Sequence, residues 1–185
     1  CSEIGIFSEV HSFTQDAQQQ EVLDCIHALN ENTHIHGILV QLPLPPHFEN
    51  NRVITSIAVE KDVDGFHLYK IGALVTGNAH FLPCTPYGVM VMLERHQISI
   101  EGQHAVVVGR SNIVGKPMAL MLLERGATVT VCTSRTRDLS QFTKQADILI
   151  VAPGKPLLIT AAMVKPGVTV IDVGINRLAD GTLCG

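Results

Sequence analysis

The stretch that decides the fold is Val106-Val107-Val108-Gly109-Arg110-Ser111-Asn112-Ile113-Val114-Gly115-Lys116-Pro117. Its three consecutive valines favour a buried strand over a helix, and the residues that follow Pro117 are strong helix formers. Proline is tolerated in the first turn of a helix, because its missing N–H would have no partner there. The stretch therefore predicts a strand, a glycine turn and a helix whose N-terminus presents free N–H groups and a positive dipole end to an anion.

The glycine spacing fits the dinucleotide-binding fingerprint only in part. That fingerprint is Gly-x-Gly-x-x-Gly, whereas Ser111 stands at the second glycine position and Gly115 comes one residue late. By spacing alone, the turn is either a nucleotide site or an ordinary tight connection between a strand and a helix.

The rest of the C-terminal half alternates between strands and helices. Strands are predicted at residues 127–132, 147–152 and 168–173, with a short helix at 139–144 and a helical turn at 160–164. Continuous apolar strands that alternate with helices are typical of a doubly wound parallel sheet. This context favours the nucleotide interpretation of the glycine turn.

The end of the second strand indicates which nucleotide. An NAD site places an acidic residue about 20 residues beyond the glycines, whereas an NADP site uses positive charge and hydroxyl groups for the 2′-phosphate. Here the strand runs into Thr133, Ser134 and Arg135, with no acid before Asp138, and Arg110 adds a cation that can fork onto phosphate oxygens. NADP is the predicted cofactor, although one or both arginines are alternatively plain surface residues.

The N-terminal half predicts a second, smaller α/β layer. A helix is expected at 14–30 with Thr14 as its cap, a short buried strand at 37–41 that ends in a proline-rich segment, and a helix at 51–59. Ligands bind at the carboxyl ends of strands in such sheets. Gln41 lies at such an end, so it is either a site residue or a glutamine that satisfies loop backbone.

Residues 61–67 carry two acids around one valine, followed by Gly65. The segment is either an Asx-type turn or a place where one carboxylate accepts from an amidine-like or amino-pyrimidinone edge. Further on, a helix is expected at 88–96 with Thr85 as its cap. The domain boundary is placed there, which gives domains of residues 1–84 and 85–185.

The composition excludes several classes of function. The chain has 185 residues, 46% hydrophobic and 16% charged, which describes a globular protein. A formal charge of −4 leaves no basic field for nucleic acid, and no apolar run is long enough to span a membrane. The five cysteines form no Cys-x-x-Cys pair, which argues against zinc and a disulfide scaffold and suits the cytoplasm. No metal site is predicted. Because the chain starts at Cys1 and ends at Gly185, we expect a fragment.

Five segments together resemble the family of bifunctional methylenetetrahydrofolate dehydrogenase/cyclohydrolases. They occur in family order with family-like spacing over nearly the whole chain, at residues 37–45, 61–65, 83–88, 109–117 and 172–176. The resemblance implies two α/β lobes, the C-terminal one Rossmann-like, with a folate substrate in the cleft between them. It also implies NADP-dependent oxidation of 5,10-methylenetetrahydrofolate to the methenyl form and hydrolysis of that product to 10-formyltetrahydrofolate. Such enzymes serve one-carbon metabolism and purine biosynthesis as cytoplasmic homodimers.

The resemblance also implies roles for individual residues. In the folate domain, Gln41 matches the glutamine that assists a catalytic lysine, Asp64 the aspartate that anchors the pterin ring, and Leu42 and Pro43 lie beside the substrate. The residues expected to bind the cofactor are Thr85, Gly109, Arg110, Ser111, Gly115, Ser134, Arg135, Gly174 and Ile175. Within this set, Ser134 is expected near the 2′-phosphate, and Thr85 and Ile175 near the nicotinamide.

The chain departs from the family in one important respect. The family's general acid/base lysine lies in a Tyr-x-x-x-Lys segment, and neither Tyr69 nor Tyr87 is followed by a lysine four residues later. The cyclohydrolase step needs such a proton carrier. We therefore expect little or no cyclohydrolase activity from these 185 residues alone, and both activities from the whole protein.

Two alternative functions are considered. One is another two-domain NADP dehydrogenase of the shikimate type, which should carry a paired lysine and aspartate for substrate hydroxyls; Lys61 and Asp62 are the nearest such pair. The other is a nucleotide-binding module without catalysis, which should bind NADP but not folate.

Overall fold

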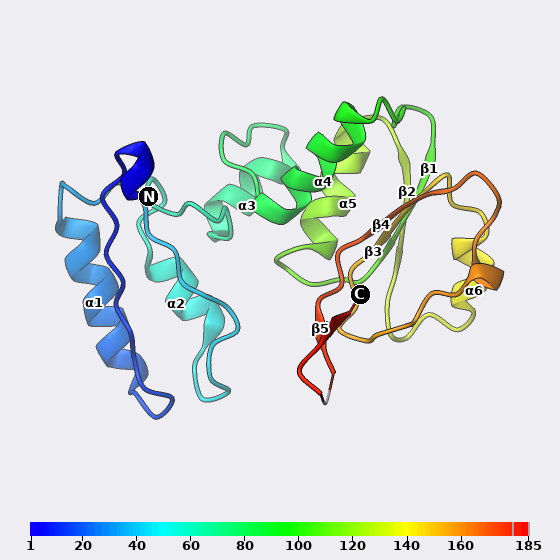
Figure 1. Cartoon of the computed structure of the whole chain (residues 1–185). Helices are drawn as coiled ribbons and strands as arrows, with labels where there is room; N and C mark the ends of the chain where they lie inside the picture. The colour runs from blue at the N-terminus through cyan, green and yellow to red at the C-terminus, as the bar shows by residue number, and fades with distance from the viewer. Residues whose placement is uncertain (179, 185) are drawn as a thin grey trace. The chain divides into compact units, whose positions relative to one another are not determined.

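The computed structural model describes residues 1–178 and 180–184 (Figure 1). The chain divides into two compact units, Cys1–Val63 and Asp64–Gly185. The sequence places the domain boundary later, after residue 84, and that boundary stays a prediction.

Unit 1 is built on two helices, α1 (Gln19–Glu31) and α2 (Asn50–Ser56), preceded by the short 3-10 helix η1 (Ser2–Ile4). The helices pack on a core of buried apolar side chains, which are Val22, Ile26, Ile38, Phe48, Val53 and Ile57. The strand predicted at 37–41 is wrong as a strand: the segment forms one isolated parallel bridge, between Ile38 and Asp62. Three nearby prolines, at 43, 45 and 46, leave the segment few N–H donors with which to extend the pairing.

The start of α1 also differs from the prediction. Thr14 does not cap the helix; its side chain hydrogen-bonds to Asp16 and thereby lowers the pKa of that carboxyl. The helix begins five residues later, where the Gln18 backbone N–H donates to Glu21 Oε1 (3.2 Å), one half of a capping box. The Thr14 hydroxyl therefore bonds within a local turn and does not cap the helix, contrary to the sequence prediction.

Unit 2 contains a four-stranded parallel sheet in the order β2-β1-β3-β4. Its strands are β1 (His104–Val108), β2 (Thr128–Cys132), β3 (Ile148–Val151) and β4 (Thr169–Asp172). The strand order reverses between β1 and β3, because β2 lies on one side of β1 while β3 and β4 follow on the other. Such a switch point is where open α/β sheets bind ligands.

Helices cover both faces of this sheet. On one face, Ala105 and Val107 of β1 join a core with α3 (Leu68–Val75), α4 (Cys84–Arg95) and α5 (Gly115–Glu124). On the other, Val106 and Val108 face α6 (Leu139–Thr143) and the segment around the 3-10 helix η2 (Ala161–Met163). Figure 1 shows α4 and α5 on one side of the strands and α6 on the other. The predicted doubly wound, Rossmann-like fold is confirmed.

Three elements differ from the sequence prediction or were absent from it. Helix α4 begins at Cys84 after Pro83, so Thr85 lies in its first turn and is not its cap; Pro86 is accepted there because that turn needs no N–H donor. Helix α3 was not predicted, since its cap is an unusual one: His67 Nδ1 accepts from the Tyr69 N–H at 3.1 Å. The hairpin of β5 (Asn176–Arg177) and β6 (Leu183–Cys184) was also not predicted.

The amino-terminal edge of the sheet is held by an ionic cluster. Asp147 Oδ1 accepts from Lys165 Nζ at 2.5 Å, and Asp147 Oδ2 accepts from the His104 backbone N–H at 2.8 Å. The lysine hydrogen bond, followed by the backbone bond, lowers the pKa of the Asp147 carboxyl. The cluster joins the starts of β1 and β3 to the loop before β4, at the edge opposite the carboxyl ends.

Within the described residues, no helix is both long and apolar enough to cross a membrane.

Candidate functional site

The carboxyl edge of the sheet gathers most of the residues expected to bind a cofactor. Val108 is in register with Cys132 and Val151, and Val151 is in register with Asp172. The segments that leave these four residues therefore start from the same edge. Gly109, Arg110 and Ser111 follow β1, Ser134 and Arg135 follow β2, and Gly174 and Ile175 follow β4.

The two glycines of the turn allow three backbone segments to meet. Gly109 has φ +128°, and a Cβ built on it would lie 2.8 Å from the Ala152 carbonyl oxygen. A Cβ on Gly115 would overlap the Gly109 carbonyl oxygen and lie 2.6 Å from the Gly109 carbonyl carbon. Glycine is thus required at both positions, and the late third glycine serves the close packing of strand and helix that the fingerprint provides.

Ser111 takes the second glycine position and closes the turn with its side chain. Ser111 Oγ accepts from the backbone N–H groups of Val114 (3.1 Å) and Gly115 (3.2 Å). A hydroxyl has two acceptor lone pairs and one donor. With both lone pairs used, the hydroxyl proton is the part of Ser111 left to donate to an anion at the N-terminus of α5, and Ser111 itself is exposed.

The cations around the turn differ in how they are held. The Lys116 ammonium donates to Asn112 Oδ1 at 2.7 Å, one helical turn away. Arg110 is exposed beside Gly109, and Arg135 is exposed at the end of β2. The β2 turn that carries Ser134 and Arg135 is fixed by its own threonines, since Thr133 Oγ1 accepts from the Arg135 N–H at 3.1 Å.

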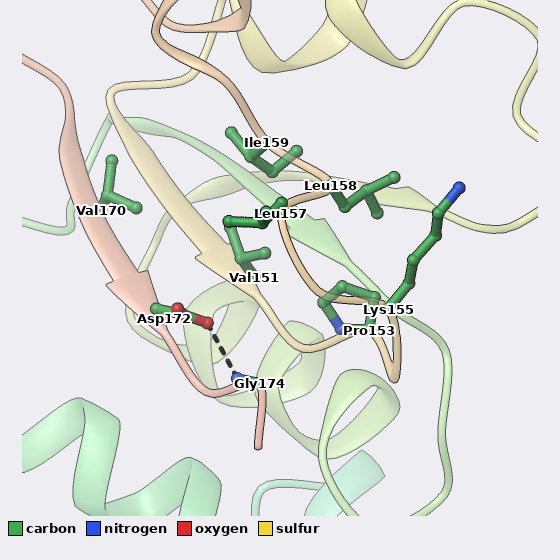
Figure 2. A pocket seen from close by; sticks show the side chains of 9 residues that line it. All are labelled: Val151, Pro153, Lys155, Leu157, Leu158, Ile159, Val170, Asp172 and Gly174. Atoms are coloured by element: carbon green, nitrogen blue, oxygen red, sulfur yellow. Dashed lines mark hydrogen bonds between the residues drawn. The ribbon is translucent and has the colours of Figure 1, made fainter. Parts of the chain in front are cut away.

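A pocket of about 200 Å³ opens at the carboxyl ends of β3 and β4 (Figure 2). Its lining is mostly apolar and consists of Val151, Pro153, Lys155, Leu157, Leu158, Ile159, Val170, Asp172 and Gly174. Asp172 Oδ1 accepts from the Gly174 N–H at 2.9 Å, which bends the chain over the strand end. Beyond it, Asn176 Nδ2 is buried and has no hydrogen-bond partner among the described residues. Buried polar groups in folded proteins are nearly always hydrogen-bonded, to protein or to ordered water, so this donor is available to a further partner.

The residues expected at a folate site lie partly in each unit. Gln41, Leu42 and Pro43 belong to unit 1, where Gln41 is exposed and its Nε2 donates to the Leu42 carbonyl at 3.1 Å. Asp64 is half-buried and opens unit 2. Thr85 is exposed in the first turn of α4.

Two further side chains at the sheet edge were missed by sequence reasoning. Lys155 and Asn176 follow strand ends, and that position was the signal that could have identified them, as it did for Gln41. By contrast, burial raises the pKa of the Cys132 thiol at the end of β2, which makes it a core residue and not a nucleophile. Among residues 1–178 and 180–184, no three His, Cys, Asp or Glu side chains come together in a group that could hold a metal ion.

Comparison with known proteins identifies the family. The catalytic-domain model of tetrahydrofolate dehydrogenase/cyclohydrolase matches residues 1–64, and the NAD(P)-binding-domain model matches residues 83–185. The chain belongs to the tetrahydrofolate dehydrogenase/cyclohydrolase family. The resemblance drawn from the five motifs is confirmed, and a shikimate-type dehydrogenase is no longer an alternative.

Relatives within the tetrahydrofolate dehydrogenase/cyclohydrolase family match the whole chain. The bifunctional protein FolD of Nitrosospira multiformis is 71% identical over 185 residues, which are 100% of this chain and 64% of that protein. The FolD protein of Nitrosomonas eutropha is 63% identical over the same span and 63% of its own length. The chain thus spans just under two thirds of the length of these curated relatives.

Solved structures agree with this assignment. The FolD methylenetetrahydrofolate dehydrogenase/cyclohydrolase of Campylobacter jejuni superposes with a TM-score of 0.94 at 52% identity, over 99% of this chain and 65% of that one. The Trypanosoma brucei dehydrogenase-cyclohydrolase, which was crystallised with NADP and an inhibitor, superposes with a TM-score of 0.88 at 35% identity, over 92% of this chain and 61% of that one.

Proposed function

We propose that the whole protein oxidises 5,10-methylenetetrahydrofolate to 5,10-methenyltetrahydrofolate with NADP and hydrolyses the product to 10-formyltetrahydrofolate. The observation that carries the proposal is the glycine turn at the switch point of the sheet, where the Ser111 hydroxyl and the N-terminus of α5 would hold an anion. Family membership and the bifunctional FolD relatives give this site its substrate class.

The residues at the sheet edge fit a phosphorylated dinucleotide. At the Gly109–Gly115 contact no side chain stands between the end of β1 and the start of α5, so a pyrophosphate could approach the backbone there, with Arg110 beside it. Ser134 and Arg135 would hold the 2′-phosphate, because Arg135 supplies a cation where an NAD site has an acid. The bound NADP of the Trypanosoma brucei relative supports this choice of cofactor.

The opposite end of the cofactor would lie at the carboxyl ends of β3 and β4, near Gly174 and Ile175, with Thr85 beside the nicotinamide. An apolar pocket lies there, and the buried Asn176 amide has an N–H donor without a partner among the described residues. When bound, NADP supplies the hydride acceptor, and the protein supplies position and electrostatics.

The proposed folate contacts are Gln41, Leu42, Pro43 and Asp64. Asp64 would accept from the amino-pyrimidinone edge of the pterin through charge-assisted hydrogen bonds. Gln41 would act beside the reacting centre, where its amide offers both a donor and an acceptor, with Leu42 and Pro43 against the substrate. Asp64 and Gln41 are thus the proposed catalytic-domain contacts.

The proposal also includes a cellular setting. All five cysteines are free thiols, which suits the cytoplasm. The family resemblance supports a homodimer and a role in one-carbon metabolism and purine biosynthesis.

Ligand-dependent stabilisation tests the proposal, because a ligand raises the melting temperature only of a protein that binds it. We expect NADP and a tetrahydrofolate analogue each to raise the Tm of the whole protein. Asp64→Asn should abolish the folate shift and keep the NADP shift. A shift with NADP alone would favour a non-catalytic nucleotide-binding module, and no shift with either ligand would refute the proposal.

A further inference from the structure

The Lys61 side chain reaches the C-terminus of α1, about 30 residues upstream in the sequence. Its Nζ donates to the carbonyl oxygens of Leu29 (2.9 Å), Asn30 (2.5 Å) and Asn32 (2.9 Å). A lysine ammonium has three N–H donors. All three are thus directed at the backbone of one helix end.

This contact satisfies carbonyl groups at the C-terminus of α1. The last carbonyls of an α-helix have no partner within the helix, and they carry the negative end of its dipole. The Asn32 N–H satisfies the Ala28 carbonyl, and Lys61 takes the carbonyls that follow it. The Lys61 side chain therefore links the end of α1 to the segment around residue 61 by long-range hydrogen bonds.

The backbone of that segment is held from two further directions. The N–H groups of Lys61 and Asp62 both donate to the Ala58 carbonyl, at 2.8 Å and 3.0 Å. The Lys61 carbonyl accepts from the Ile38 N–H at 2.7 Å, within the parallel bridge that pairs Ile38 with Asp62. Asp62 is only 2% exposed, so this crossing of two chain segments is buried.

The two segments also touch at a glycine. A Cβ on Gly37 would lie 2.5 Å from Val63 Cγ1, so a side chain at residue 37 would force the Val63 side chain to shift. The path of residues 61–63 is therefore set on one side by the end of α1 and on the other by residues 37–38.

We propose that Lys61 is a positioning residue for folate binding. Asp64 follows Asp62 by two residues, and Gln41 follows Ile38 by three, so the chain segments fixed by the Lys61 ammonium lead directly to both proposed folate contacts. Lys61 itself donates to three backbone carbonyls, so its proposed role is to position these segments and not to bind the substrate. The inference rests on the proposed function, in which Asp64 and Gln41 bind folate.

The first experiment tests, without any ligand, whether the Lys61 contact with the end of α1 holds the bridge between Ile38 and Asp62. Lys61→Met keeps the length of the side chain and removes its donors. Lys144→Met is the matched control, since Lys144 lies at the C-cap of α6, is exposed and makes no side-chain hydrogen bond within the described part of the chain. Hydrogen exchange of the Ile38 amide reports the bridge. We expect it to accelerate by roughly tenfold or more in Lys61→Met, as local opening becomes easier, and to stay unchanged in Lys144→Met. Unchanged exchange in Lys61→Met would overturn the proposal.

The second experiment tests the consequence for folate, in the protein expressed from its complete gene. Loss of a well-placed charge-assisted hydrogen bond weakens binding by about 10- to 100-fold, so Lys61→Met should weaken binding of a tetrahydrofolate analogue by that factor and leave the NADP Kd unchanged. Lys61→Arg, which retains several donors, should recover part of the loss.

General destabilisation is controlled by Val22→Ala, which opens a cavity in the core of the same unit. The proposal holds if Val22→Ala lowers the Tm as much as Lys61→Met does, while the Val22→Ala protein binds the folate analogue as tightly as the wild type. It is overturned if the two variants lose folate affinity equally, or if Lys61→Met loses none. A wild-type protein that binds no folate would refute the proposed function and, with it, this inference.

Discussion

Replacing Gly115 with alanine should destabilise unit 2. The same replacement at Gly88, a glycine within α4, serves as the control. The new Cβ would lie 2.6 Å from the Gly109 carbonyl carbon and 2.8 Å from the Arg110 nitrogen, so these atoms would have to withdraw by about 1 Å to reach the 3.4–4 Å of ordinary van der Waals contact. They cannot do so freely, because a Cβ position on Gly109 already lies 2.8 Å from the Ala152 carbonyl oxygen on its other side. The obstacle is backbone, which no rotamer change relieves.

Overpacking of this kind costs about 1–3 kcal/mol, and 1 kcal/mol lowers Tm by roughly 2–4 °C in a chain of this size. Gly88→Ala is the matched control: Gly88 lies within α4 and its Cβ would have no heavy atom within 4 Å, so alanine should stabilise by up to about 1 kcal/mol. Thermal unfolding followed by circular dichroism measures both shifts. If Gly115→Ala melts at or above the wild-type temperature, or if both variants shift alike, the close-packing argument is wrong.

The other predictions concern the ionic cluster, the core and the turn. Because the pKa of the Asp147 carboxyl is lowered in the folded state, its pairing with Lys165 stabilises the protein above the ordinary carboxyl pKa of 3.8, and this contribution is lost as the pH falls from there through the lowered pKa. Lys165→Met should thus lower the urea midpoint more at pH 6 than at pH 3, and an equal loss at both would contradict the assignment. Leu122→Ala removes a fully buried side chain and should cost about 2–5 kcal/mol in urea unfolding; a loss below about 1 kcal/mol would place Leu122 outside the core. Arg135→Ala should weaken NADP binding by about tenfold or more while the NAD Kd, measured by calorimetry in parallel, stays the same; equal losses would exclude a 2′-phosphate contact. Ser111→Ala should weaken both dinucleotides, since each presents its pyrophosphate to the same hydroxyl, and unchanged affinities would remove Ser111 from the site.

The elements that sequence reasoning predicted well depend on neighbours along the chain. The valines of β1, the glycine turn and the helix formers of α5 agree with one another locally, and the apolar strands β2, β3 and β4 lie within one residue of their predicted bounds. Turn chemistry was less predictable. Thr14 and Thr85 are both residue types that cap helices, yet Thr14 bonds to Asp16 and Thr85 lies inside α4. Each hydroxyl has several partners within reach, and the rest of the fold selects among them.

The pattern along the chain by itself determined that strands and helices alternate in the C-terminal half and that a glycine turn joins β1 to α5, because these depend on short-range propensity and on periodic burial. Tertiary structure alone decided the strand order β2-β1-β3-β4 and the reach of Lys61 to the end of α1. These features join residues whose contact requires the whole core to be buried first, and no local preference encodes them.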